Sequence, residues 1–375
     1  MDEQTRQLLI EAAILAPSAD NSQPWLYRWN NEALEIWIDE SRSGGFSDQR
    51  FVLSDLAIGA CIENIVMRAH SFGYDSQIEY LPDPEQTPLW AARINFSPAP
   101  KQYEALAQFI PERHTDRSFP WKGPITTATE QFLSDEAAKI QGVTLIWIDG
   151  TPNYKAALKA MWLAESLRFS NKELHHELFS SIRFEVGNRA SCTEGLAPAT
   201  LAIEPPLRLA FKLLRHWPVM KALNWLGGNY LIGFRSAVLP TLLSPALCLL
   251  SVEQTDRASI IRAGQALQRT WLSATAQGIS LQPFAAAGVF SLRFIQPHPT
   301  LIPACRKISQ LLKAISNNNQ GLLLLRLGIA APAPAHNYRR APSSFSHSTP
   351  HCQDSLQHQL TPCSPSKSKQ NIFQK

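Results

Sequence analysis

The stretch that decides the fold is Ala16-Pro17-Ser18-Ala19-Asp20-Asn21-Ser22-Gln23-Pro24-Trp25. It follows an apolar run with helical spacing (residues 8–15) and precedes a strand-like run (residues 26–29). Proline lacks an N–H and disfavours a helical backbone in the residue before it, so the helix is expected to end at Pro17. Three polar side chains then lie on a turn where they can face a ligand: Ser18, Asn21 and Gln23. A hydrogen-bonded turn beside a buried tryptophan is the alternative.

Composition limits the class of protein. The chain has 375 residues, 45% apolar and 18% charged, which is enough for two ordinary domains or one large domain. The net charge of +4, without a basic cluster interleaved with aromatics, predicts no nucleic-acid partner. The six cysteines form no CxxC pair, which argues against a zinc site or a disulfide framework.

Membrane association is not favoured by the sequence. The polar residues 1–6 do not resemble a signal peptide, and the uncharged runs 236–252 and 270–292 are short or interrupted by proline and glycine. The basic and apolar stretch 207–226 is compatible with a membrane surface, but a packed helix pair broken at Pro218 is favoured. We therefore expect a cytoplasmic protein without a membrane partner.

The chain contains an internal repeat. Gly59 to Gly73 matches Gly264 to Gly278 in spacing, each reading as a helix with a glycine after its end. Two strand-like segments recur in the same order: 34–39 matches 145–149, and 90–94 matches 323–327. The sequence thus predicts two tandem modules, residues 1–105 and 106–340.

Spacing within the repeat predicts an insertion in the second module. Asp39 precedes Gly59 by 20 residues, whereas Asp149 precedes Gly264 by 115. The excess places an insertion at about 151–256. Its large apolar side chains are expected to pack on the body of the protein: Phe211, Leu214, Trp217, Leu223 and Trp225. Residues 341–375 are rich in Ser, Pro, Gln, His and Lys and predict a disordered tail.

A second motif begins the second module, Glu112-Arg113-His114-Thr115-Asp116-Arg117-Ser118-Phe119. Alone, it is typical of a solvated turn. A phosphate group, however, needs fixed cationic and N–H or O–H donors, and the planar guanidinium supplies two donors at once.

Together the two motifs resemble those of the nitroreductase family of flavin proteins. Residues 16–25 look like the family's Ala-Pro-Ser loop, and residues 112–119 resemble the basic motif that holds the flavin phosphate and pyrimidine edge. The resemblance implies an α+β fold with mostly antiparallel sheets flanked by helices, and FMN and NAD(P)H as cofactors. It assigns cofactor binding to Ser18, Asn21, Gln23, Arg113, His114, Thr115 and Arg117.

Each motif occurs once, so the chain looks like a fused, degenerate dimer with one complete site, of the Acg-like or ThiF-associated type. Two weaker matches to the family pattern imply that Pro283 lies beside the flavin ring and that a C-terminal cation neutralises the phosphate. That cation is either Arg326, which could equally be a structural strand residue, or Arg339.

The resemblance implies an FMN-dependent oxidoreductase that passes electrons from NAD(P)H to an unidentified small acceptor. The cofactor carries out the chemistry, so no catalytic side chain or metal is assigned. A non-catalytic FMN-binding or storage protein is the main alternative. A module that has lost the flavin and works beside a ThiF-type adenylating partner is a third.

Overall fold

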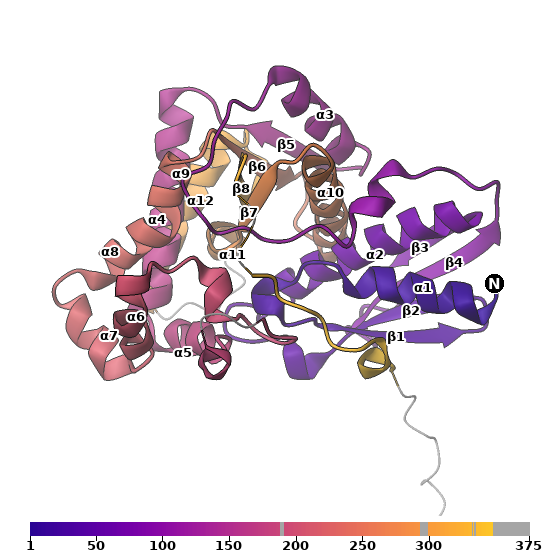
Figure 1. Ribbon diagram of the computed structural model, residues 1–375, viewed down its shortest axis with the longest axis horizontal. Coiled ribbons are helices and arrows are strands. Elements are labelled where there is room, and N and C mark those ends of the chain that lie inside the picture. Colours follow the sequence, from indigo (N-terminus) through magenta and orange to yellow (C-terminus); the bar gives the residue numbers. More distant parts are fainter. Residues whose placement is uncertain (188–190, 293–298, 332, 334, 348–375) are drawn as a thin grey trace, which may run out of the picture.

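Two four-stranded antiparallel sheets form the framework of the chain (Figure 1). The structure, a computed structural model, describes residues 1–187, 191–292, 299–331, 333 and 335–347. The first sheet has the order β1-β2-β4-β3 and contains β1 (Trp25–Asn30), β2 (Ala33–Ile38), β3 (Tyr74–Tyr80) and β4 (Trp90–Pro98). The second has the order β5-β6-β8-β7 and contains β5 (Val143–Trp147), β6 (Ala246–Val252), β7 (Ser280–Phe284) and β8 (Gln320–Gly328).

Helices flank both sheets. The first part of the chain supplies α1 (Glu3–Ile14) and α2 (Val52–Phe72), which pack on each other. Around the second sheet lie α3 (Thr127–Ala138), α4 (Thr151–Ser170), α10 (Arg257–Ala276), α11 (Ala286–Leu292) and α12 (Ile302–Ile315). The expected α+β fold with antiparallel sheets is confirmed.

The long helices α2 and α10 join the two halves along their length (Figure 1). Their interface is apolar but carries buried polar pairs. The guanidinium of Arg269 lies 2.5 Å from Glu63 and 3.1 Å from Glu136, and the Gln268 amide donates to Asn64 at 2.7 Å. Because burying an unpaired charge or amide costs free energy, these contacts favour one relative position of α2 and α10 along their axes.

The internal repeat is real, but one predicted equivalence is wrong. In sheet order, β4 corresponds to β8 and α2 to α10, as expected. Residues 34–38 lie in β2, whereas residues 145–147 lie in β5, the counterpart of β1. The true partner of β2 is β6. The letters Ile-Trp-Ile-Asp match by chance, because a strand's place is set by its neighbours in the sheet and not by its apolar content.

The inserted segment therefore lies earlier than predicted. It runs between β5 and β6, residues 148–245, where the first half has only the tight turn between β1 and β2. The predicted range 151–256 wrongly included β6, a central and fully paired strand. Besides α4, the segment contains α5 (Lys172–Ser180), α6 (Arg208–Leu214), α7 (Trp217–Asn224), α8 (Gly228–Gly233) and α9 (Leu239–Leu242).

The insertion has a small core of its own, formed by Phe169, Phe179, Ile182 and Met220. Of the five large apolar residues expected to pack on the body of the protein, four pack on this core of the insertion instead: Phe211, Leu214, Trp217 and Leu223. Trp225 does not, and 85% of its surface is exposed. It follows α7 directly, in the turn before α8, and so points away from the packed helix faces.

The predicted disordered tail begins too early. Residues 342–345 form a 3-10 turn, and Phe345 is buried against Trp25 and Tyr27 of β1. Ser346 then forms a bridge with Tyr27. The prediction used the average composition of the segment, which does not show that a single aromatic residue, Phe345, packs on β1. Residues 348–375 lie outside the described residues.

Candidate functional site

The loop after α1 has an unusual backbone. Asp20, Asn21 and Gln23 have φ angles of 50°, 57° and 53°, in the left-handed region that side chains other than glycine disfavour. The hydroxyl oxygen of Ser18 accepts a hydrogen bond from the Gln23 N–H at 3.0 Å and holds the turn. Strained positions of this kind persist where the surroundings fix them, and they cluster at binding sites.

Amide side chains tie this loop to two distant segments. Gln23 is fully buried; its amide nitrogen donates to the Thr193 carbonyl at 2.7 Å, and its oxygen accepts from the Arg340 N–H at 3.0 Å. Asn21 donates to the carbonyls of Thr193 and Tyr338. Gln23 therefore shapes the loop and lines no cavity of the site, contrary to its expected role in cofactor contact.

Arg113 of the second motif contacts the C-terminal end of α1. Its guanidinium donates to the Leu15 carbonyl at 2.9 Å and lies 4.7 Å from the centre of the Trp271 ring. Its Nε is buried without a hydrogen-bond partner. Burial, together with the charge of Arg339, lowers the pKa of Arg113 to about 9. The positive charge of Arg113 is thus disfavoured both by burial and by the nearby charge of Arg339.

Two more arginines share this environment. Arg339 donates to the carbonyls of Ile14 and Ala16 and to the Asn21 side-chain oxygen, and burial lowers its pKa to about 10. Arg117 donates to the Thr200 carbonyl, and burial lowers its pKa as well. Within the described part of the chain, none of the three forms an ion pair with a carboxylate. Desolvated cations that have no ion-pairing carboxylate favour an anionic ligand.

The three arginines line one cavity of about 690 Å³. Ser18, Asn21, His114 and Thr115 line it too, so the structure brings both motifs to one place. The segment 335–339 closes it, and the rings of His114 and His336 meet edge to face at 4.4 Å. This polar space is called the basic cavity below.

A second, more apolar cavity of about 530 Å³ adjoins the first. Both are lined by Ser18, Thr115, Arg117 and Trp271, so these residues mark where the two spaces meet. Pro283 and Phe284 of β7 form part of the wall of this apolar cavity, and the insertion supplies another part through Phe211, Leu214 and Ile232.

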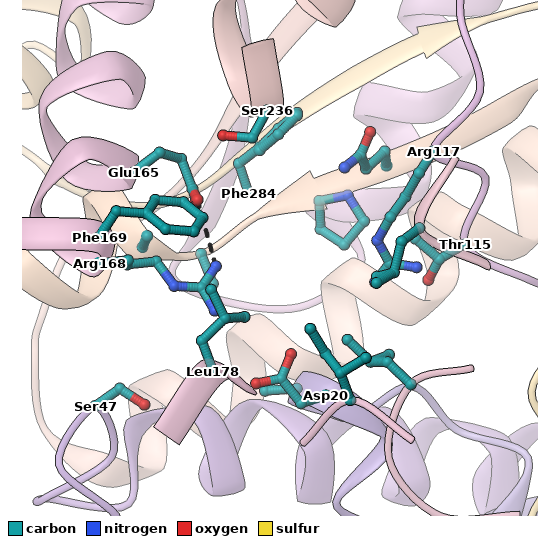
Figure 2. Close-up of a pocket in the computed structure, with 18 of the residues that line it drawn as sticks. Asp20, Ser47, Thr115, Arg117, Glu165, Arg168, Phe169, Leu178, Ser236 and Phe284 are labelled. Atoms are coloured by element: carbon teal, nitrogen blue, oxygen red, sulfur yellow. Dashed lines mark hydrogen bonds and ion pairs between the residues drawn. The ribbon is translucent and has the colours of Figure 1, made fainter. Parts of the chain in front are cut away.

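Charged groups interrupt the apolar lining at its edges. Figure 2 shows Thr115 and Arg117 on one side of the view and the ion pair of Glu165 with Arg168 on the other, with Asp20 below. Burial lowers the pKa of Arg168, but the charges of Glu165, Asp20 and Glu177 outweigh this and raise it. Asp20, from the first module, thus lies near two cations of the second module, Arg117 and Arg168.

Arg326, the other C-terminal candidate, is not part of the site. It lies on β8 with no exposed surface and lines neither cavity. Its guanidinium donates to Gln282, Ser244 and the Ser118 carbonyl and stacks 3.7 Å from the Trp121 ring centre. With its donors used in this way, Arg326 is a structural residue, and Arg339 is the C-terminal cation of the basic cavity.

Sequence reasoning missed some residues that line the site. Trp271 on α10 lines both cavities, but within a repeated helix an aromatic residue indicates only a core position. His336, Asn337 and Tyr338 line the basic cavity from a segment after the Pro- and Ala-rich run. No motif marks this segment, because its position depends on contacts with the distant loop 18–23.

Comparison with known proteins finds relatives in Mycobacterium tuberculosis. No protein-family model matches the chain. The protein named putative NAD(P)H nitroreductase Acg, from Mycobacterium tuberculosis, is 29% identical over 282 residues, which covers 72% of this chain and 77% of that protein. Putative NAD(P)H nitroreductase Rv3131 of the same organism is 26% identical over 287 residues, covering 75% and 76%.

A further relative is longer. The uncharacterized protein MT1398 of M. tuberculosis is 25% identical over 300 residues, covering 78% of this chain but 41% of that protein. The chain thus spans about two fifths of the length of MT1398.

Solved structures show a remote similarity. A nitroreductase with bound FMN from Bacteroides fragilis matches with a TM-score of 0.37 and 10% identity, over 66% of this chain and all of that one. The nitroreductase NfnB of Mycobacterium smegmatis, in complex with NADPH, has a TM-score of 0.34 and 17% identity, over 65% and 98%. The two sequence motifs meet at one site, and in sequence the chain is a distant homologue of the Acg-like putative NAD(P)H nitroreductases of M. tuberculosis.

Proposed function

We propose that the chain is an FMN-dependent oxidoreductase that takes electrons from NAD(P)H and passes them to a small acceptor. The observation that carries the proposal is the set of three arginines, buried Arg113 and partly buried Arg117 and Arg339, that line one cavity and form no ion pair with a carboxylate among the described residues. The names of the mycobacterial relatives and the cofactors of the solved nitroreductases point the same way.

The phosphate of FMN fits the basic cavity. Its two negative charges would pair with guanidinium groups that form no ion pair among the described residues, and the unpartnered Nε of Arg113 would supply a free donor. His114 and Thr115 line the same cavity and offer further polar contacts. These residues, with Ser18, would hold the ribityl phosphate end of the cofactor.

The flavin ring is suited to the junction of the two cavities and the apolar space beyond it. Trp271, Pro283 and Phe284 give that space an apolar surface, and Ser18 and Thr115 place hydroxyl groups at its entrance. When bound, FMN would supply the chemistry, accepting a hydride from NAD(P)H and returning two electrons to an acceptor. The chain's own residues would bind and orient the reactants, and the insertion would keep water from them.

The proposal is tested by an anaerobic titration of the FMN-loaded protein with NADPH and then NADH. We expect the visible absorbance of the flavin to be lost with one equivalent of the preferred nucleotide and to return when an acceptor is added. Failure to retain FMN would contradict the proposal and favour an interaction module without a cofactor.

A non-catalytic FMN-binding protein is the second candidate. One observation favours it: helices of the insertion form part of the apolar cavity's wall, and a wall of this kind can restrict access to a bound flavin. Under this alternative the protein retains FMN, but neither nucleotide bleaches it, whereas dithionite, a small reductant, does.

A further inference from the structure

The outer surface of the insertion exposes an unusual number of large apolar side chains. We call them the outer patch: Leu207, Leu209, Leu213, Trp225, Leu226 and Leu231. Leu209, Trp225, Leu226 and Leu231 have 71%, 85%, 86% and 70% of their surface exposed. They come from α6, α8 and the turns beside them, and α7 contacts both helices at one end of the molecule (Figure 1). Exposed apolar patches of this kind mark interaction sites.

The segment that carries the patch is positively charged. The 48 residues from 205 to 252 contain five Lys or Arg residues and no Asp or Glu. Four of the five are exposed: Arg208, Lys212, Arg215 and Lys221. In the part of the chain that the structure describes, none of these four forms an ion pair with a carboxylate. The surface therefore combines an apolar centre with unneutralised cations.

We propose that the outer patch docks on the surface of an anionic lipid bilayer. Helices that lie in the membrane interface have this composition: leucines and an aromatic residue on one face, with lysines and arginines beside them. Trp225 and Tyr230, both exposed, belong to the residue types enriched at the level of the lipid headgroups. Among the described residues, no helix is long and apolar enough to cross a membrane, so the contact would be peripheral.

Charge distinguishes this occupant from a second copy of the chain. A symmetric dimer through the outer patch would bring the same surface from both copies together and oppose cations to cations. An anionic bilayer instead accepts the leucines in its interface and the cations at its phosphates.

The patch also adjoins the candidate site. Leu207 and Leu231 belong to the outer patch and also line the apolar cavity. A docked protein would thus hold this cavity next to the bilayer. The docking itself does not rest on the proposed function, because it is measured with lipid alone.

The test is cosedimentation of the full chain with vesicles of phosphatidylglycerol and phosphatidylcholine, and with phosphatidylcholine alone. We expect binding to the anionic vesicles that weakens as salt is raised. Replacing the leucines and tryptophan (Leu209→Gln, Leu213→Gln, Trp225→Gln and Leu226→Gln) should abolish binding. The pair Lys212→Gln and Lys221→Gln should weaken it by roughly fivefold for each residue.

Matched controls lie on other parts of the surface. The triple variant Lys101→Gln, Tyr103→Gln and Phe132→Gln removes one cation and two exposed rings outside the insertion and should leave vesicle binding unchanged. The charge pair alters only exposed side chains, so it keeps the test valid if the apolar variant fails to fold. Absence of binding to anionic vesicles, or equal binding by all variants, would overturn the proposal. So would a dimer in light scattering that the apolar variant dissociates.

Discussion

Gly59 on α2 and Gly264 on α10 lie directly against each other at the crossing of the two long helices. A Cβ atom on Gly59 would stand 1.9 Å from the Ile261 carbonyl oxygen, and one on Gly264 would stand 2.1 Å from the Leu56 carbonyl oxygen. In both cases the obstacle is the backbone of the other helix. The two glycines that reveal the repeat therefore also allow the backbones of the two helices to lie in close contact.

Gly59→Ala and Gly264→Ala should each destabilise the protein by about 3 kcal/mol or more, because the added methyl group forces two helix backbones apart. Gly278→Ala is the matched control: its φ is +69° but a Cβ there meets nothing within 4 Å, so it should cost about 1–2 kcal/mol of conformational strain. Urea unfolding measures all three. Equal losses would mean that the close approach contributes nothing.

Arg113→Ala and Arg117→Ala should weaken FMN binding by roughly 10- to 150-fold, the cost of about 1.5–3 kcal/mol for a lost charge-assisted contact. Riboflavin, which lacks the phosphate, should lose far less. Arg215→Ala, which removes an exposed cation outside both cavities, controls for net charge. Fluorescence titration with both ligands gives the ratio. A similar loss for FMN and riboflavin would show that these arginines act through folding and not through the phosphate.

His175 predicts a pH dependence within the insertion. Its Nε2 lies 2.8 Å from the Leu214 carbonyl oxygen, and burial lowers its pKa below the usual 6.5. The unfolded chain then takes up a proton before the folded chain does. Stability is therefore complete above about pH 6.5 and falls as the pH drops below it, by up to about 1.4 kcal/mol per pH unit.

The measurement is thermal or urea unfolding between pH 7.5 and 5. His175→Gln should flatten the dependence, whereas His176→Gln, which removes only the smallest of the causes that shift the pKa of His175, should keep most of it. If both variants follow the parent curve, His175 does not govern this transition.

Phe345 should contribute to stability although it lies in a polar, low-complexity segment. Only 1% of its surface is exposed, and its ring centre lies 6.2 Å from that of Trp25. Phe345→Ala should cost about 3–5 kcal/mol, as for other buried rings. Phe132→Ala on α3, with 39% of the residue's surface exposed, should change the free energy of unfolding by no more than about 0.5 kcal/mol. Unchanged stability in Phe345→Ala would restore the expectation that the tail begins at residue 341.

Local signals predicted the parts of the site that depend on neighbouring residues. Pro17 disfavours a helical backbone in the residue before it, so the end of α1 could be predicted from local sequence. The helical periodicity of 59–73 and 264–278 indicated the helices that join the halves. The two short motifs predicted a single site for Ser18 and Arg113, and both residues line the basic cavity.

Features set by distant contacts could not be predicted in the same way. Gln23 resembles a ligand-binding amide in the motif, yet its bonds go to Thr193 and to the Arg340 backbone. Arg326 and Arg339 are both cations near the end of the second half. Their contacts distinguish them. Arg326 packs against Trp121 and is structural, whereas Arg339 donates to the carbonyl groups at the end of α1 and lines the basic cavity.

The central claim is that both motifs and Arg339 form a single FMN site in each chain. Equilibrium dialysis of the flavin-free protein against FMN tests it most directly, with Arg113→Ala measured beside it. We predict one FMN per chain at saturation and a large loss of affinity in the variant. Two tight sites per chain, or no saturable FMN binding, would contradict the account.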